Sequence, residues 1–366
     1  MKNNDVWKKM ISIGAAVLVS AALAACGSSG SSAPAGGASE TSTGAGGGAE
    51  APAQTEGEES GIPEEIRIGY WASPNSELLV KQTGTLEKAY PDTKVSWVEF
   101  SSGADILTAI QAGSIDLSTI GTPPGTTGIV NEYPFYVYYL EDIIGESEGL
   151  IVREDSGIET LADLEGRTIA TSFSTTSHFS FLKALEQAGI DSKSINIMDM
   201  DASNIYAAWD RGDIDGAYIW ESVKSQILND GGKEIISSAE VADQGAVTGE
   251  FGIVHKDFYA KYPDVIRTYV DLLDEATDLF NNDSENAAAI LSTGLGLTEE
   301  EALKAMSGIR EITKEEQTEY FGTPEAPGQL PQILKDTASF LYSQGKLTAD
   351  PEISVFQDAI LTEIYQ

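Results

Sequence analysis

The feature that most constrains the fold is a helix–glycine–strand pattern that occurs twice in the chain. It lies at 109–121, "AIQAGSIDLSTIG", and at 208–220, "AWDRGDIDGAYIW". In both copies a helical pattern leads to a glycine, Gly113 or Gly212, and Ile-Asp then precedes a β-rich run. Glycine suits the left-handed conformation that commonly ends a helix. We therefore expect two similar α/β units, with Ile115 and Ile214 buried at the start of a strand.

Short β-rich runs alternate with helical patterns from residue 62, which predicts an α/β fold with mostly parallel strands. After residue 238 one further strand, "EFGIVHKDF", precedes amphipathic helices. We predict a lobe one made of 62–149 and 250–366, whose helical tail packs on it, and a lobe two at 150–249. Two lobes joined by two crossover segments can close on a ligand bound at the strand ends.

The N-terminus has the features of a secretory signal, predicted at 1–25. Three lysines precede the apolar run "MISIGAAVLVSAALAA" and the only cysteine, Cys26. The sequence "LAAC" resembles a bacterial lipobox, which implies a lipid on Cys26. Residues 26–61 contain no aromatic and no large aliphatic side chain, so we expect a disordered tether. These segments predict an extracytoplasmic lipoprotein anchored to the bacterial membrane.

Charge and cysteine content exclude several classes of function. The chain has 58 acidic against 22 basic residues, a formal charge of -36 that disfavours nucleic acid as a partner. If Cys26 carries lipid, no thiol remains for a disulfide, a zinc site or a nucleophile. We therefore expect neither a metal nor a cofactor.

Polar turns follow the predicted strands of both lobes. Turns rich in hydroxyl residues or glycine at 70–79, 100–107, 120–128 and 172–179 precede predicted helices. A helix N-terminus favours an anion, and serine and threonine add donors without adding charge. Thr175, Thr176 and Ser177 could thus hold an oxyanion without a salt bridge. Plain helix capping is the alternative for each hydroxyl.

Acidic and aromatic residues at the crossovers could bind a cationic group. Glu250 lies at the predicted return crossover and Glu148 at the outward one. Tyr70, Trp71 and Trp220 lie at strand ends, where an aromatic face could cover an alkyl or ammonium group. For the two acids, a solvated surface position is the alternative.

Several segments resemble the taurine-binding subunits of ABC importers, within the group that binds sulfonates and nitrate. They are "FSSGADIL", "GESEGLIV", "STTSHFSFLKAL", "AAWDRGDIDGAYIW" and "KDTASFLYSQGK". The resemblance implies a type II bilobal periplasmic-binding-protein fold that captures taurine or a small sulfonate. It also implies a membrane permease with a cytoplasmic ATPase as partner; we expect a monomer.

The resemblance also implies site residues. The sulfonate would bind Thr175, Thr176, Ser177 and His178, together with the Gly121–Thr122 turn, and Glu250 would meet the amine. Three residues depart from the family pattern: Glu250 replaces a shorter Asp, Trp71 a smaller polar residue, and Glu221 a small uncharged one.

Other functions remain open at this point. An enzyme is one rival, but the chain has only two histidines, His178 and His255, and no common catalytic motif. A ligand sensor that signals through a partner is another. Among binding proteins, an alkylsulfonate without an amine or a quaternary amine could replace taurine.

Overall fold

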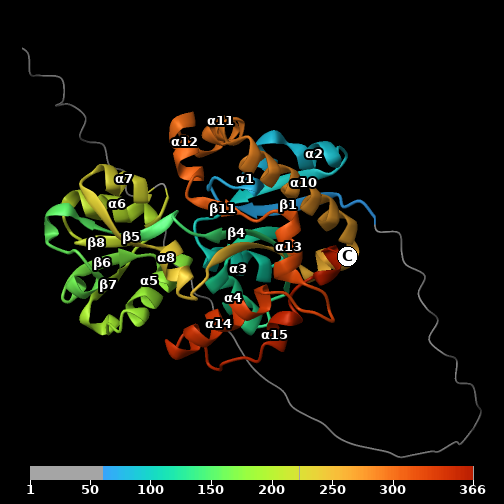
Figure 1. Ribbon diagram of the computed structural model, residues 1–366. Coiled ribbons are helices and arrows are strands. Elements are labelled where there is room, and N and C mark those ends of the chain that lie inside the picture. The colour runs from blue at the N-terminus through green and yellow to red at the C-terminus, as the bar shows by residue number, and fades with distance from the viewer. Residues whose placement is uncertain (1–60, 222, 366) are drawn as a thin grey trace, which may run out of the picture. The chain divides into compact units, whose positions relative to one another are not determined.

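The computed structural model describes residues 61–221 and 223–365. The predicted signal peptide, Cys26 and the tether up to residue 60 lie outside the described residues. The chain forms two β-sheets covered by helices, which confirms the predicted α/β class (Figure 1).

The first sheet has six strands in the order β11-β4-β10-β3-β1-β2. The strands are β1 (Glu65–Tyr70), β2 (Lys94–Glu99), β3 (Leu117–Gly121), β4 (Phe135–Ile144), β10 (Gly249–His255) and β11 (Ile309–Glu311). Strand β10, which comes after the whole second sheet in sequence, therefore lies between β4 and β3. We call this sheet with its helices the first unit.

The second sheet has five strands in the order β7-β6-β8-β5-β9. The strands are β5 (Glu148–Arg153), β6 (Thr168–Thr171), β7 (Asn196–Asp199), β8 (Gly216–Trp220) and β9 (Gly232–Ser237). All of them come from one continuous stretch of chain, 148–237. We call this sheet with its helices the second unit.

Helices cover both sheets. In the first unit they are α1 (Ser76–Thr83), α2 (Thr85–Ala89), α3 (Gly103–Gln111), α4 (Thr122–Val130), α9 (Lys256–Lys261), α10 (Pro263–Asn282), α11 (Ser284–Leu295), α12 (Glu299–Met306), α13 (Lys314–Phe321), α14 (Leu330–Ser343) and α15 (Ser354–Gln357). In the second unit they are α5 (Thr176–Gln187), α6 (Ala202–Arg211), α7 (Val223–Asn229) and α8 (Ser238–Asp243). The helical tail packs on the first unit as predicted, since Ile266 and Phe356 join its buried clusters.

The sheets are mixed, so the expectation of mostly parallel strands is wrong. β1 pairs in parallel with β2 and β3, and β6 with β7 and β8, but β5 and β10 are antiparallel to their neighbours. The reason is the path of the chain. β5 starts beside the last residue of β8, and β10 starts beside the last residue of β3. Each therefore runs in the direction opposite to its neighbour.

The repeated glycine pattern has the expected conformation. Gly113 and Gly212 have φ of 62° and 75°, and Gly212 caps α6. Ile115 and Ile214 are buried, as predicted. The helical run "SELLVKQTGTLEKAY" at 76–90 is divided into α1 and α2 at Gly84, which also has positive φ.

Two strands were missed in the sequence, β9 and β11. β9 is the edge strand "GKEIIS" and β11 has only three residues, "IRE". Both carry charged residues, which weakens their alternating pattern. No helix in the described part of the chain is long and apolar enough to span a membrane.

Candidate functional site

Several of the predicted site residues lie where the chain crosses between the two units. Glu148, the first residue of β5, pairs with Trp220 at the end of β8. Glu250, the second residue of β10, pairs with Gly121 at the end of β3. A methyl group placed on Gly121 would lie 3.2 Å from Thr176 Cγ2, so the turns of the two units are in contact. We call Gly121, Thr122, Glu148, Thr176, Ser177 and Glu250 the crossing site.

The hydroxyl residues before α5 have three different roles. Thr175 is the N-cap: its Oγ1 accepts a bond from His178 N at 3.3 Å and donates to Ser172 O at 2.7 Å. Thr176 Oγ1 donates to Glu148 Oε1 at 2.5 Å. Ser177 is fully buried, and among the described residues its Oγ has no partner with hydrogen-bond geometry. Capping thus explains Thr175, while the Ser177 hydroxyl lies close to Glu148, whose pKa it lowers, without a hydrogen bond of good geometry.

Glu148 lies at this hydroxyl turn, where the sulfonate was expected, and not at the amine end where the sequence placed it. The cause is the start of β5 beside α5 and α8. Its Oε2 accepts a bond from Ser238 Oγ at 3.4 Å, and Ser238 in turn bonds Tyr218 OH at 2.9 Å. Burial raises the pKa of Glu148 to about 7, although Thr176, Ser177 and Ser238 oppose the shift. Near neutral pH this carboxyl can therefore be neutral or charged.

The N-terminus of α4 offers fewer donors than that of α5. Pro123 and Pro124 follow Thr122, and proline has no N–H. Thr122 Oγ1 accepts a bond from Gly249 N at 3.4 Å, which leaves its hydroxyl proton free to donate. An anion in the crossing site is therefore better served by α5 than by α4.

Glu250 stands in an acidic environment. Its backbone N donates to Asp142 Oδ1 at 2.9 Å, and the residue is partly exposed. Burial and the charge of Asp142 hold the pKa of Glu250 well above its ordinary value. A cationic group close to Glu250 would relieve this repulsion.

His178 belongs to the turn but carries no charge near neutral pH. Burial and Lys346 lower its pKa to about 4. Its Nδ1 accepts a bond from Ser174 N at 3.3 Å, and its ring stacks on Phe173 at 4.3 Å. It lines a cavity of about 260 Å³ whose wall includes Thr175 and Lys346.

The three aromatic residues predicted as walls lie in different places. Tyr70 OH donates to Glu99 Oε2 at 3.0 Å and its ring contacts Trp97, so the structure does not bring Tyr70 to the crossing site. Trp71 packs against the core cluster that contains Ile120, and its buried indole N–H has no acceptor among the described residues. Trp220, opposite Glu148, packs beside α6 and α7.

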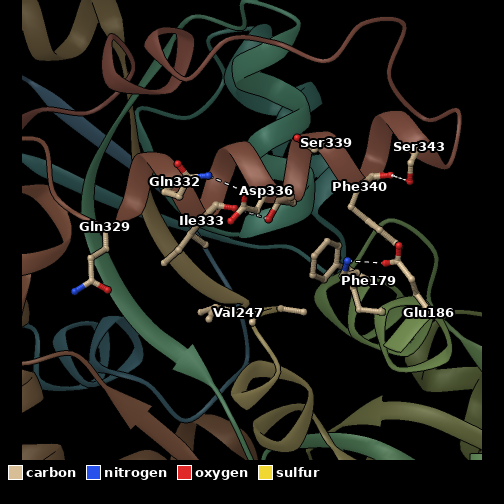
Figure 2. A pocket seen from close by; sticks show the side chains of 14 residues that line it. Phe179, Glu186, Val247, Gln329, Gln332, Ile333, Asp336, Ser339, Phe340 and Ser343 are labelled. Carbon is tan, nitrogen blue, oxygen red and sulfur yellow. Dashed lines mark hydrogen bonds and ion pairs between the residues drawn. The ribbon is translucent and has the colours of Figure 1, made fainter. Parts of the chain in front are cut away.

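A larger cavity, of about 600 Å³, lies between α14, α5 and residues 245–247. None of the predicted site residues lines it. Figure 2 shows Phe340 of α14 beside Phe179 of α5, and their ring centroids are 4.9 Å apart. Lys183 lies over the same Phe340 ring, at 4.8 Å. The C-terminal helix α14 thus contacts the second unit.

The sequence interpretation missed several buried acids around Glu250. Glu77, Glu141, Asp142 and Glu311 are all nearly inaccessible to solvent. The signal was present in the strand "FYVYYLEDII", where two adjacent acids interrupt an apolar run. Within the described ranges, no group of His, Cys, Asp or Glu is arranged to hold a metal ion.

Residues 94–287 match a protein family described as "NMT1/THI5 like". The chain is similar to the taurine-binding periplasmic protein of Escherichia coli K12, with 31% identity over 78% of this chain and 88% of the relative. It is also similar to the solved periplasmic aliphatic sulphonate-binding protein of Escherichia coli. That match has a TM-score of 0.68 and 26% identity, and covers 80% of this chain and 92% of the other.

A second solved structure supports the same fold. The alkanesulfonate-binding protein of Xanthomonas axonopodis pv. citri, bound to MOPS, matches with a TM-score of 0.69 and 23% identity. The match covers 82% of this chain and 99% of that chain. The predicted periplasmic-binding-protein fold is therefore confirmed.

Proposed function

The chain belongs to the NMT1/THI5-like family, and from this membership and the site we propose that it is the substrate-binding protein of an ABC importer. It captures taurine or a related small sulfonate between its two units and delivers it to a membrane permease driven by a cytoplasmic ATPase. The names of its taurine- and sulfonate-binding relatives support this ligand class.

One observation carries the proposal: the hydroxyl turn at the start of α5 contacts the Gly121 turn of the other unit, beside which Glu250 lies. Ser177 Oγ lies in the first turn of α5, a 12-residue helix whose end attracts anions. Glu250 lies beside Gly121, whose turn touches Thr176 of α5. The sulfonate binds the α5 turn and Thr122, and the amine binds Glu250.

The ligand favours a closed arrangement of the units because it contacts both of them. The moving unit is lobe two, at 150–249, and lobe one consists of 62–149 and 250–366. The bounds of the second sheet, 148–237, support this division. The protein acts as a monomer outside the cytoplasm, anchored through lipid on Cys26 after cleavage of the signal peptide.

The hydrogen bonds of the two histidines favour a binding role over catalysis. His178 Nδ1 accepts a bond from Ser174 N, and His255 Nδ1 accepts one from Asp257 N at 3.2 Å in the first turn of α9. Both rings thus stabilise turns. Prolonged incubation with taurine should release no sulfite; its release would restore the enzyme hypothesis.

The test of the proposed function is isothermal titration of the purified protein with taurine, ethanesulfonate and glycine betaine. Tight binding of taurine and weak binding of ethanesulfonate would establish a site for both ends of a zwitterion. The reverse order would assign the importer to simple alkylsulfonates. Binding of glycine betaine alone would overturn the sulfonate proposal.

A further inference from the structure

Five acidic residues form a group that includes Glu250 of the crossing site and extends into the first unit. We call Glu77, Glu141, Asp142, Glu250 and Glu311 the carboxyl row. Cross-strand pairing places Glu311 of β11 next to Asp142 of β4, and Asp142 next to Glu250 of β10. The pairing shifts by one residue between Glu250 and Phe251, which leaves Glu141 as the extra residue of a β-bulge. A bulge re-aims a side chain, and here it adds a carboxyl to the row.

Helix α1 explains only part of the row. Ser76 N donates to Glu311 Oε1 at 2.8 Å, and Glu77 N donates to Glu141 Oε1 at 3.1 Å, so two carboxyls cap the first turn of α1. Glu77 Oε2 and Glu141 Oε2 are buried and have no partner with hydrogen-bond geometry among the described residues, although the Thr119 hydroxyl lowers the pKa of both acids. Capping α1 does not require Asp142 or Glu250.

A second observation comes from a tyrosine outside the row. Tyr138 is fully buried, and its hydroxyl has no hydrogen-bond partner in the described part of the chain. Its ring centroid lies 6.3 Å from that of Tyr269, whose hydroxyl donates to Glu77. Burial raises the pKa of Tyr138, and the charges of Glu77 and Glu141 add to the shift. A buried hydroxyl without a partner therefore lies close to the Glu77 end of the row.

The surroundings of the row contain acids and hydroxyls. α1 contributes Glu77, β4 contributes Glu141 and Asp142, and β5 adds Glu148 at the crossing site. From α10, Tyr269 OH donates to Glu77 Oε1 at 3.3 Å and Thr277 Oγ1 donates to Glu311 Oε2 at 3.0 Å.

Lys314 pairs with Asp271 and Asp274, at 3.1 and 3.2 Å. Among the described ion pairs, none joins a basic residue to the row.

A buried carboxylate without a cation is costly, so the row retains protons. Burial is the largest cause of the raised pKa of all five acids, Glu77, Glu141, Asp142, Glu250 and Glu311. For every one of them except Glu141, the negative charge of a neighbouring acid raises the pKa further. Glu250 alone is partly exposed, so it is the end of the row that a ligand can reach.

We propose that the carboxyl row makes the crossing site specific for ligands that carry a cationic amine, and that such a ligand releases protons from the row when it binds. This inference rests on the proposed function, because it takes the crossing site as the ligand site. Glu250 contacts the amine. Glu77, Glu141, Asp142 and Glu311 are positioning residues that act through Glu250.

The sign of the linkage follows from the charge. An ammonium group favours the ionised row and lowers its pKa values, so binding releases protons and the affinity rises with pH. The sulfonate has the opposite effect on Glu148, because a second negative charge favours its protonated form. The two ends of a zwitterion therefore titrate in opposite directions.

The experiment compares taurine with ethanesulfonate, which lacks the amine, between about pH 5.5 and pH 8. Since both ligands share the sulfonate end, the ratio of their affinities isolates the amine. We expect this ratio to rise with pH, by up to about tenfold per pH unit for one released proton. Titration in two buffers with different ionisation enthalpies should show more protons released by taurine than by ethanesulfonate.

A ratio that stays constant while both ligands bind would overturn the inference and leave the proposed function intact. If neither sulfonate binds, the proposed function itself fails. These two failures are therefore distinguishable in one data set.

Glu141→Gln tests whether the row acts as a unit. The amide oxygen can still accept from Ser76 and Glu77, so taurine binding should persist, with a weaker pH dependence of the ratio and fewer protons released. Glu311→Gln provides a second variant if the first does not fold. Glu165→Gln, at an exposed acid, is the matched control. An unchanged proton count in a folded row variant would contradict the inference.

Discussion

Glu148 and Glu250 occupy equivalent positions in the two units but have different surroundings. Each lies at the start of a strand that is antiparallel to its neighbours, opposite the last residue of the adjacent strand. Glu148 is surrounded by hydroxyls, and the charge of Lys224 lowers its pKa somewhat. Glu250 is surrounded by further carboxyls.

The difference shows how the environment assigns roles to two similar side chains. Hydroxyls can donate to a carboxylate or to a sulfonate, so the Glu148 end tolerates a bound anion once Glu148 is protonated. The Glu250 end has an excess of negative charge that only a cation can offset. Burial raises the pKa of both, but their neighbours distinguish an anion end from a cation end.

The largest effect should come from Glu250→Gln. Loss of a charged partner for the amine should weaken taurine binding by about 10- to 100-fold, as expected for a hydrogen bond to a charged group. Ethanesulfonate affinity should change little. Calorimetric titration of both ligands measures this, and equal losses for the two would remove Glu250 from the amine end.

Glu148→Gln should act mainly through pH. In the natural protein, ethanesulfonate affinity should fall as pH rises through about 7, because Glu148 loses its proton beside the sulfonate. The variant should lose this dependence and bind up to about tenfold more tightly at about pH 8. Dissociation constants at several pH values test it. A variant that keeps the pH profile would show that another group titrates.

Ser177→Ala and Thr175→Ala form a matched pair in the same turn. Removing the unpartnered Ser177 hydroxyl should weaken both sulfonates by about fivefold, close to 1 kcal/mol. Removing the capping Thr175 hydroxyl should instead lower the free energy of unfolding by about 1 kcal/mol. Titration and urea unfolding separate the two effects. If Ser177→Ala left both affinities unchanged, the hydroxyl would have no role in binding.

The smallest effect should come from Tyr70→Phe. Its hydroxyl bonds the exposed end of Glu99, away from the crossing site, so both affinities should stay within about twofold. Fluorescence or calorimetric titration is sufficient here. A clear loss of affinity would return Tyr70 to the ligand site.

The sequence predicted the elements that depend on local chemistry. Gly113 and Gly212 end segments where a left-handed conformation is needed, and Ile115 and Ile214 follow them into the core. The hydroxyl turn before α5 was also recognised, because its residues are neighbours in the chain.

The contacts between distant segments could not be predicted in the same way. Glu77, Glu141 and Glu311 lie in three separate segments, and only the pairing of β11 with β4 and the packing of α1 bring them together. The direction of β5 placed Glu148 beside Thr176, against expectation. In the sequence, Glu77 and Glu311 are indistinguishable from solvated acids, and only Glu141 interrupts an apolar run.

The position of β10 has a consequence for the order in which the protein can fold as it is made. β10 lies between β4 and β3, yet it is synthesised after the whole second unit. The second sheet needs only residues 148–237, so a nascent chain can complete it while β3 and β4 still lack the strand between them. The pairing of β10 with β3 and β4 then joins segments that are separated in sequence by the entire second unit, and such long-range pairing is slow. The first unit, whose synthesis begins first, is therefore the unit that completes its fold last.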